Sequence, residues 1–216
     1  MPMFKRKQKI FCIGTGKTGT TSVEQALKDF GYKMGDQAKG ELLIHEYGKR
    51  NFDKIVEFCR SAEAFQDAPF CFKYTYMALD MAFPGSKFIL TERDSSELWY
   101  QSLIKFHSKI HVEEPKIPSI EDLKNATYRY KGYAWDVRQI VYGMKEGQDP
   151  YDKEILINYY EDHNAAIKDY FRHKDNLLQI NLSDTDAYSK FCSFIGKAPL
   201  YKEFPWENKT SEIVKK

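Results

Sequence analysis

Apolar residues near the N-terminus form a short unbroken run that gives way to a helical period. The run KIFCI at residues 9–13 is typical of a buried strand and stops at Gly14. Four apolar residues then recur at helical spacing as far as Gly31, namely Val23, Ala26, Leu27 and Phe30. We therefore expect a strand, a glycine-rich turn and an amphipathic helix, in that order.

Extended and helical patterns continue to alternate along the chain. Apolar runs bounded by turn residues predict strands at residues 64–66, 87–92 and 176–182. Helical spacing predicts helices at residues 41–49, 52–62, 74–83, 96–109, 120–144, 151–171 and 186–196, and Gly132 could break the helix predicted at 120–144. Strands that alternate with helices predict an α/β fold with a central parallel sheet covered by helices on both faces.

Length and composition fit one domain over residues 1–216, with 42% hydrophobic and 15% aromatic residues. A net charge of +2 gives no overall field for nucleic acid or for a membrane surface, so we expect neither as a partner. No apolar run approaches the roughly 20 residues that span a bilayer, and the one after the basic N-terminus is too short for a signal peptide. We expect a cytoplasmic protein with four separate, reduced and buried cysteines, Cys12, Cys59, Cys71 and Cys192.

Ligands of parallel α/β sheets bind beyond the carboxyl ends of the strands, here at residues 14–22, 67–69 and 93–96. The first of these loops, GTGKTGTTS, joins a strand to a helix, and such a loop directs backbone N–H groups and the helix dipole at an anion. Its glycines allow tight or left-handed backbone, and Lys17 adds a mobile charge. Hydroxyls and further N–H groups come from Thr18, Thr20, Thr21 and Ser22. The loop is predicted to bind phosphate, although an ordinary glycine turn with a threonine cap is the plainer interpretation.

Two common nucleotide patterns fit this loop poorly. The ATP and GTP loop G-x-x-x-x-G-K-[ST] requires glycine at Phe11, which lies inside the predicted strand. The dinucleotide pattern G-x-G-x-x-G matches Gly14, Gly16 and Gly19, but no acidic residue stands convincingly at the end of a second strand.

The remaining motif, K-[ST]-G-T-T, resembles the phosphosulfate-binding loop of the sulfotransferases. The likeness continues in LKDFGY, FPGSKFILTERD, WYQSL, YYEDHN, LLQINLSD, FCSFIG and FPWENKT, which together resemble the smaller, bacterial-type branch of that superfamily. The resemblance implies a P-loop-like three-layer fold and the cosubstrate 3′-phosphoadenosine 5′-phosphosulfate (PAPS), which leaves as PAP, with no metal required. It also implies that Lys17 reaches the bridging oxygen, and that the 5′-phosphate is bound by Gly16, Thr18, Gly19, Thr20, Thr21 and Ser22.

The resemblance further implies that Arg93 binds the 3′-phosphate together with a serine. In the family that serine lies eight residues after the arginine, where this chain has Gln101, so Ser102 is the first candidate, and Ser95 or Ser96 are alternatives. Judged alone, Arg93 could instead be a surface arginine paired with a neighbouring carboxylate. The segment FPWENKT lacks the family's Arg-Lys-Gly, which leaves Asn208 and Lys209 as weaker candidates at the nucleotide.

The general base stays open between two residues. Family members place a histidine where this chain has FQDAP, so Asp67 is the first candidate and His107 the second. Asp67 would need a raised pKa to act as a base, and it could equally cap a following helix. His107 and His111 are expected at a solvated helix end rather than in a metal site, and His163 in the core with a hydrogen bond.

The acceptor is expected to be a small molecule or a glycan that offers a hydroxyl or an amine. Residues 33–39 and 109–119 are expected to shape its pocket, with the tract YRYKGYAWDVRQIVY as a possible wall. A non-catalytic nucleotide-binding module and an atypical small-molecule kinase are the alternatives to a sulfotransferase. The oligomeric state has no signal in the sequence.

Overall fold

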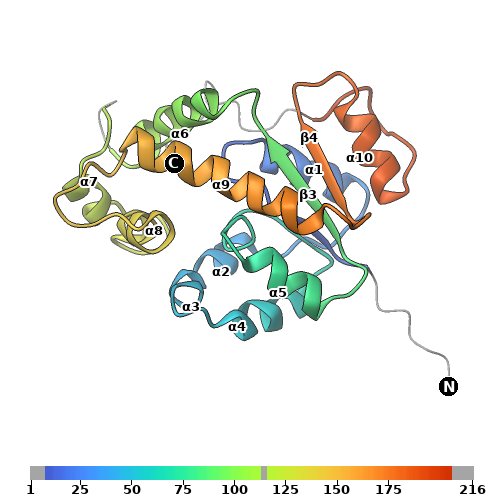
Figure 1. Cartoon of the computed structure of the whole chain (residues 1–216), viewed down its shortest axis with the longest axis horizontal. Helices are drawn as coiled ribbons and strands as arrows, with labels where there is room; N and C mark the ends of the chain where they lie inside the picture. Colours follow the sequence, from blue (N-terminus) through green and yellow to red (C-terminus); the bar gives the residue numbers. More distant parts are fainter. Residues whose placement is uncertain (1–7, 113–115, 206–216) are drawn as a thin grey trace.

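A computed structural model of the chain describes residues 8–112 and 116–205 and has a parallel sheet at its centre (Figure 1). The strands are β1 (Ile10–Cys12), β2 (Ala64–Phe65), β3 (Lys87–Glu92) and β4 (Leu177–Asn181). They lie in the order β2-β1-β3-β4, and every neighbouring pair is parallel. The predicted α/β fold is therefore confirmed, and all four predicted strands form within a residue or two of their expected ends.

Successive residues of β1 face opposite sides of the sheet, as the pleat requires. Ile10 and Cys12 pack with helices α1 (Thr20–Asp29) and α10 (Ala187–Ile195). Phe11 packs on the other face in one cluster with residues of α5 (Thr75–Ala82) and α9 (Lys153–Phe171). In Figure 1, α9 passes in front of the sheet and α1 lies behind it. These helices and the sheet form three layers.

Two of the predicted helices differ from those observed. The helix predicted at 41–49 is two short helices, α2 (Gln37–Glu41) and α3 (Ile44–Gly48), because the Asp36 carboxylate accepts the Lys39 N–H and starts the first one early. The helix predicted at 120–144 is also two, α7 (Ile120–Asn125) and α8 (Tyr133–Tyr142). The second begins after Gly132, whose φ of 90° is the left-handed conformation that favours glycine.

The remaining helices extend the core away from the sheet. They are α4 (Phe52–Phe58), followed by a 3-10 turn at Cys59–Ser61, and α6 (Ser96–Ile110). Helices α6, α7 and α8 and the first half of α9 share a third apolar cluster, in which the Trp99 and Tyr160 rings stack with centroids 4.6 Å apart. This cluster holds α6 and α8 beside the carboxyl ends of the strands, at the left of Figure 1.

The sheet order places a switch point between β1 and β3, because the chain moves from β1 to β2 on one side and returns to β3 on the other. Here the two backbones approach so closely that a β-carbon at Gly14 would lie 2.2 Å from Thr91 Oγ1. Only glycine fits at that point. The loops after β1 and β3 therefore begin in contact.

The four cysteines are free and buried, as predicted. Within the described residues, no helix is both long enough and apolar enough to cross a membrane. In the same residues, no three His, Cys, Asp or Glu side chains gather closely enough to hold a metal ion.

Candidate active site

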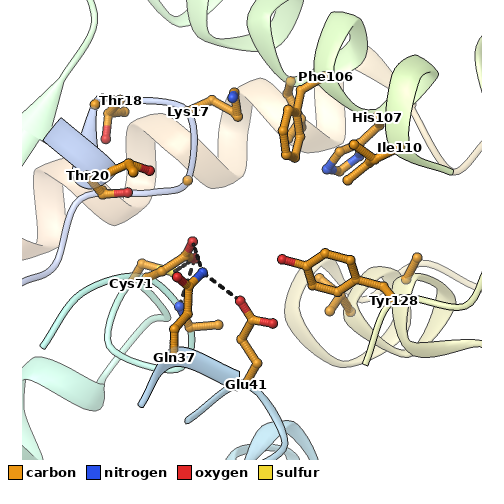
Figure 2. Close-up of a pocket in the computed structure, with 18 of the residues that line it drawn as sticks. Lys17, Thr18, Thr20, Gln37, Glu41, Cys71, Phe106, His107, Ile110 and Tyr128 are labelled. Atoms are coloured by element: carbon orange, nitrogen blue, oxygen red, sulfur yellow. Dashed lines mark hydrogen bonds between the residues drawn. The ribbon is translucent and has the colours of Figure 1, made fainter. Parts of the chain in front are cut away.

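A cavity of about 440 Å³ opens at the carboxyl ends of β1 and β3. All three loops predicted from the strand pattern reach it, through residues 16–22, Asp67 with Ala68, and Arg93. Figure 2 shows side chains that converge on it from several elements, with Lys17 and Thr20 on one side, Gln37 and Glu41 on another, and His107 and Tyr128 opposite. The cavity thus combines the predicted phosphate loop with space for a second molecule.

The loop after β1 is fixed from outside by hydrogen bonds to its backbone. Trp99 Nε1 donates to the Gly16 carbonyl at 2.9 Å, and Arg93 Nε donates to the Lys17 carbonyl at 2.7 Å. Gly19 caps helix α1 with a φ of 98°. With its carbonyls held by β3 and α6, the loop can direct its N–H groups to the cavity, where the positive end of the α1 dipole favours an anion.

The hydroxyls of this loop divide into two groups. The Thr18 hydroxyl is buried and contacts the Thr15 carbonyl and Thr91 Oγ1, each at 2.6 Å, so it holds the loop together. Thr20 and Thr21 line the cavity, and within residues 8–112 and 116–205 their hydroxyls have no hydrogen-bond partner. Ser22 uses its N–H to bond the Gly19 carbonyl. Thr20 and Thr21 are thus the hydroxyls available to a ligand, while Thr18 offers at most its backbone.

Lys17 extends its amino group over the Phe106 ring, 3.8 Å from the centroid. Burial, and after it the charge of Arg93, lowers the pKa of Lys17 to about 8. Its backbone has a φ of 73°, which is uncommon for a residue with a β-carbon. This amino group is partly desolvated, and an anion bound in the cavity would favour its protonated form.

Arg93 follows β3 and is exposed at the rim of the cavity. Its backbone N–H donates to the Tyr160 hydroxyl at 3.0 Å. The nearby carboxylates are engaged elsewhere: Asp94 accepts from Asn181 and Ser183, and Glu97 pairs with Lys153. Arg93 forms no ion pair with either carboxylate, and within the described residues its terminal guanidinium nitrogens have no hydrogen-bond partner and are available to a ligand.

The serine candidates do not join Arg93 at the cavity. Ser102 lies half-buried on α6 and is not part of the lining, whereas Leu103 beside it is. Ser95 accepts the Leu98 N–H as the cap of α6, and Ser96 donates to Glu161 at 2.6 Å. Of these residues, Ser95 and Ser96 have structural roles that explain their presence. Asn208 and Lys209 lie outside the described residues.

Asp67 lies directly after β2 in the left-handed conformation, with a φ of 63°. One carboxylate oxygen accepts the Ala68 N–H at 2.8 Å, and the other accepts from Gln37 Nε2 at 3.2 Å. Because α5 begins only at Thr75, Asp67 does not cap it. Burial raises the pKa of Asp67 above its ordinary value, against the lowering effects of the Ala68 N–H and of Lys17. Asp67 thus lines the cavity with a pKa raised in the direction that a carboxylate base needs, and its role as the base stays a prediction.

His107 lies across the cavity on α6, and its hydrogen bonds define its tautomer. Arg138 Nη2 lies 2.7 Å from Nδ1, and the Tyr151 hydroxyl lies 3.0 Å from the same atom. A guanidinium can only donate, so Nδ1 must be the acceptor and the neutral ring carries its proton on Nε2. Burial, followed by the charge of Arg138, holds the pKa of His107 well below its ordinary value. The imidazole therefore presents an N–H to a ligand instead of a lone pair.

The predicted surroundings of the histidines are wrong for His107 and His111 and correct for His163. The solvated helix end predicted for His107 and His111 is wrong, because both line the cavity and burial lowers the pKa of His111 to about 4. His163 is fully buried, with Nε2 3.0 Å from the Ile13 carbonyl, as predicted for a core histidine.

A polar network beneath the cavity has no motif in the sequence. Gln37 donates to Glu41 at 2.8 Å as well as to Asp67, and it accepts from Gln66, which also donates to Glu24. Glu41 is only 4% exposed and forms an ion pair with Arg129. The tract YRYKGYAWDVRQIVY contributes seven residues to the lining of the cavity, and its role as a wall of the acceptor pocket stays a prediction. The seven are Tyr128, Arg129, Tyr133, Ala134, Val137, Arg138 and Tyr142.

Comparison with known proteins agrees with this arrangement. A family model described as a sulfotransferase domain matches residues 9–213, which is nearly the whole chain and includes all three loops of the cavity. No curated protein matches the chain. The extent of the family match shows that this chain belongs to the sulfotransferase family.

Proposed function

We propose that the protein transfers a sulfuryl group from PAPS to a hydroxyl or an amine of a small acceptor bound in the cavity. The observation that carries the proposal is the joint placement of Lys17, Arg93 and Asp67 around one cavity at the switch point of the sheet. The first two supply positive charge where a phosphorylated nucleotide would lie. The third supplies a carboxylate beside the remaining space.

PAPS fits the donor groups of the loop. The backbone around Gly19 and the hydroxyls of Thr20 and Thr21 would hold the 5′-phosphate at the start of α1. Arg93 would hold the 3′-phosphate with its terminal nitrogens, because its Nε is already used to fix the loop. When bound, PAPS supplies the sulfuryl group and a leaving phosphate.

Transfer requires the protein to perform two tasks. Asp67 accepts the proton of the acceptor hydroxyl as that oxygen bonds to sulfur. Lys17 donates a hydrogen bond to the bridging oxygen, which keeps the electron pair when its bond to sulfur breaks. To do so Lys17 exchanges its contact with the Phe106 ring for the oxygen. His107 is unsuited to the proton transfer because its Nδ1 is occupied and its Nε2 carries a proton.

The proposal is tested by ligand-induced stabilisation and by transfer of label. PAP should raise the unfolding temperature, with a gain of about 2.7 kcal/mol at a hundredfold excess over Kd, whereas ATP with Mg²⁺ should not. Sulfur-35 from labelled PAPS should then appear on acceptors in a panel of phenols, alcohols, amines and sugars. Stabilisation by ATP with Mg²⁺ and none by PAP would favour a kinase instead. Stabilisation by PAP without transfer to any class would favour a non-catalytic module.

A further inference from the structure

Arg138 is a buried cation that forms no ion pair with any of the residues 8–112 and 116–205. It is 1% exposed, and its Nε and Nη1 atoms have no hydrogen-bond partner within the described part of the chain. The guanidinium is held between the rings of Tyr151 and Tyr142, at 4.5 and 5.1 Å, and its Nη2 bonds the neutral His107. A buried charge without a counter-ion is costly, and an arginine does not escape the cost by losing its proton.

The positive charge of Arg138 acts on the cavity through its hydrogen bond to His107. Arg138 bonds one ring nitrogen, so the ring's only proton is on the other, and the guanidinium polarises that N–H toward the cavity. In residues 8–112 and 116–205, Nε2 of His107 has no hydrogen-bond partner. The wall formed by α6 and α8 therefore offers a polarised N–H donor, backed by a cation that has no counter-ion in the described part of the chain.

The opposite wall of the cavity carries acidic side chains. Asp67 and Glu41 lie there, linked by Gln37, although the charge of Glu41 is already paired with Arg129. Figure 2 shows Gln37 and Glu41 across the open space from His107 and Ile110. Apolar side chains line much of the space between, namely Leu103, Phe106, Ile110, Leu123 and Val137. A ligand that spans this cavity meets a base at one wall and a positive potential at the other.

We propose that the acceptor is an apolar hydroxy acid, whose hydroxyl lies at Asp67 and whose carboxylate accepts a hydrogen bond from His107 Nε2, backed by the charge of Arg138. This rests on the proposed function and names its substrate class. A ligand with an ammonium group at the His107 end would be repelled by the charge of Arg138, and a neutral amide there would not offset that charge. His107 binds the carboxylate directly, while Arg138 acts through His107 as a positioning residue.

The test measures binding of matched probes to the complex of the protein with PAP. Calorimetry compares 4-hydroxyphenylacetate with its primary amide, which has the same shape without the charge. The acid should bind at least tenfold more tightly to the wild type. Arg138→Met should bring the two Kd values within about twofold of each other while the Kd for PAP stays unchanged. Lys105→Met removes a charge from an exposed position on α6, the helix that carries His107, and should leave the ratio as in the wild type.

A second variant keeps the test decisive should the loss of Arg138 unfold the protein. His107→Phe removes the donor and should bring the two Kd values together in the same way. Nitrogen-15 NMR of the wild type should show His107 protonated at Nε2 and bare at Nδ1. Equal binding of the acid and the amide to the wild type, no binding of either, or a bare Nε2 would overturn the inference. Failure of PAP itself to bind would instead count against the proposed function.

Discussion

Lys17 and Asp67 share the same left-handed backbone conformation, with φ angles of 73° and 63°, on the loops that leave the adjacent strands β1 and β2. Residues with a β-carbon seldom adopt this conformation, and such strain is concentrated at functional sites. Both side chains line the cavity, and the charge of each favours the charged form of the other. The fold thus brings the candidate cation and the candidate base to one place.

Asp67→Asn should lower kcat by about 10²–10⁴-fold, because an amide cannot accept the proton of the acceptor. Asparagine tolerates a positive φ, so the loop after β2 should keep its shape and PAP should bind as in the wild type. Steady-state kinetics and calorimetry measure the two effects. An unchanged kcat would remove Asp67 from the chemistry, and an equal loss of PAP binding would assign it to the nucleotide.

The pH profile of kcat/KM for PAPS should be bell-shaped. Asp67 must be ionised, and burial raises its pKa, so activity should fall on the acidic side at a higher pH than for an ordinary aspartate. Lys17 must be protonated, and its pKa is lowered to about 8, so kcat/KM should fall as the pH rises through about 8. In the profile of kcat the alkaline limb should shift to higher pH, because the bound nucleotide anion favours the protonated form of Lys17. A kcat/KM that stays level as the pH passes about 8 would contradict the role of Lys17.

Gly14→Ala should destabilise the fold by at least 1–3 kcal/mol, the cost of overpacking, because its β-carbon would lie 2.2 Å from Thr91 Oγ1 and 2.5 Å from the Thr91 carbonyl oxygen. Gly16→Ala is the matched control two residues along, where a β-carbon meets nothing within 4 Å. Urea denaturation compares the free energies of unfolding. Equal stability of the two variants would mean that β1 and β3 do not approach so closely.

Arg129→Met should destabilise the protein by about 3–5 kcal/mol, because it leaves the buried carboxylate of Glu41 without its ionic partner. Adding Glu41→Gln removes that orphaned charge and should recover most of the loss. Thermal unfolding of both single variants and of the double variant completes the cycle. Additive losses would show that the two side chains are not coupled.

Most of the sheet was predictable from the sequence because its signals are local. Residues 87–92 form a buried apolar run between turn residues, and the observed strand β3 has the predicted bounds. The region predicted as helix at 120–144 is two helices, and the second begins after Gly132, the position at which the sequence allowed a break. The spacing of apolar residues predicts which face of a helix is buried. It does not predict well where one helix ends and the next begins.

The site residues that were predictable from the sequence are those that belong to a motif or directly follow a predicted strand. Gly16, Lys17, Arg93 and Asp67 all follow strands, and all reach the cavity. Gln37, Glu41 and Arg138 carry no such mark, since they come from helices whose partners are distant in sequence. Ser102 was selected by spacing from Arg93, but the face of α6 that lines the cavity carries Leu103, Phe106 and His107 instead.

Calorimetric titration with PAP and with AMP, which lacks the 3′-phosphate, tests the central claim most directly. The wild type should bind PAP at least tenfold more tightly than AMP, since Arg93 adds a charged hydrogen bond to the 3′-phosphate. Arg93→Ala should cost PAP about 1.5–3 kcal/mol more than it costs AMP, because both ligands lose the bond that fixes the Lys17 carbonyl but only PAP loses a contact to its 3′-phosphate. Equal affinity of the wild type for PAP and AMP, or no effect of the substitution on PAP, would contradict the account.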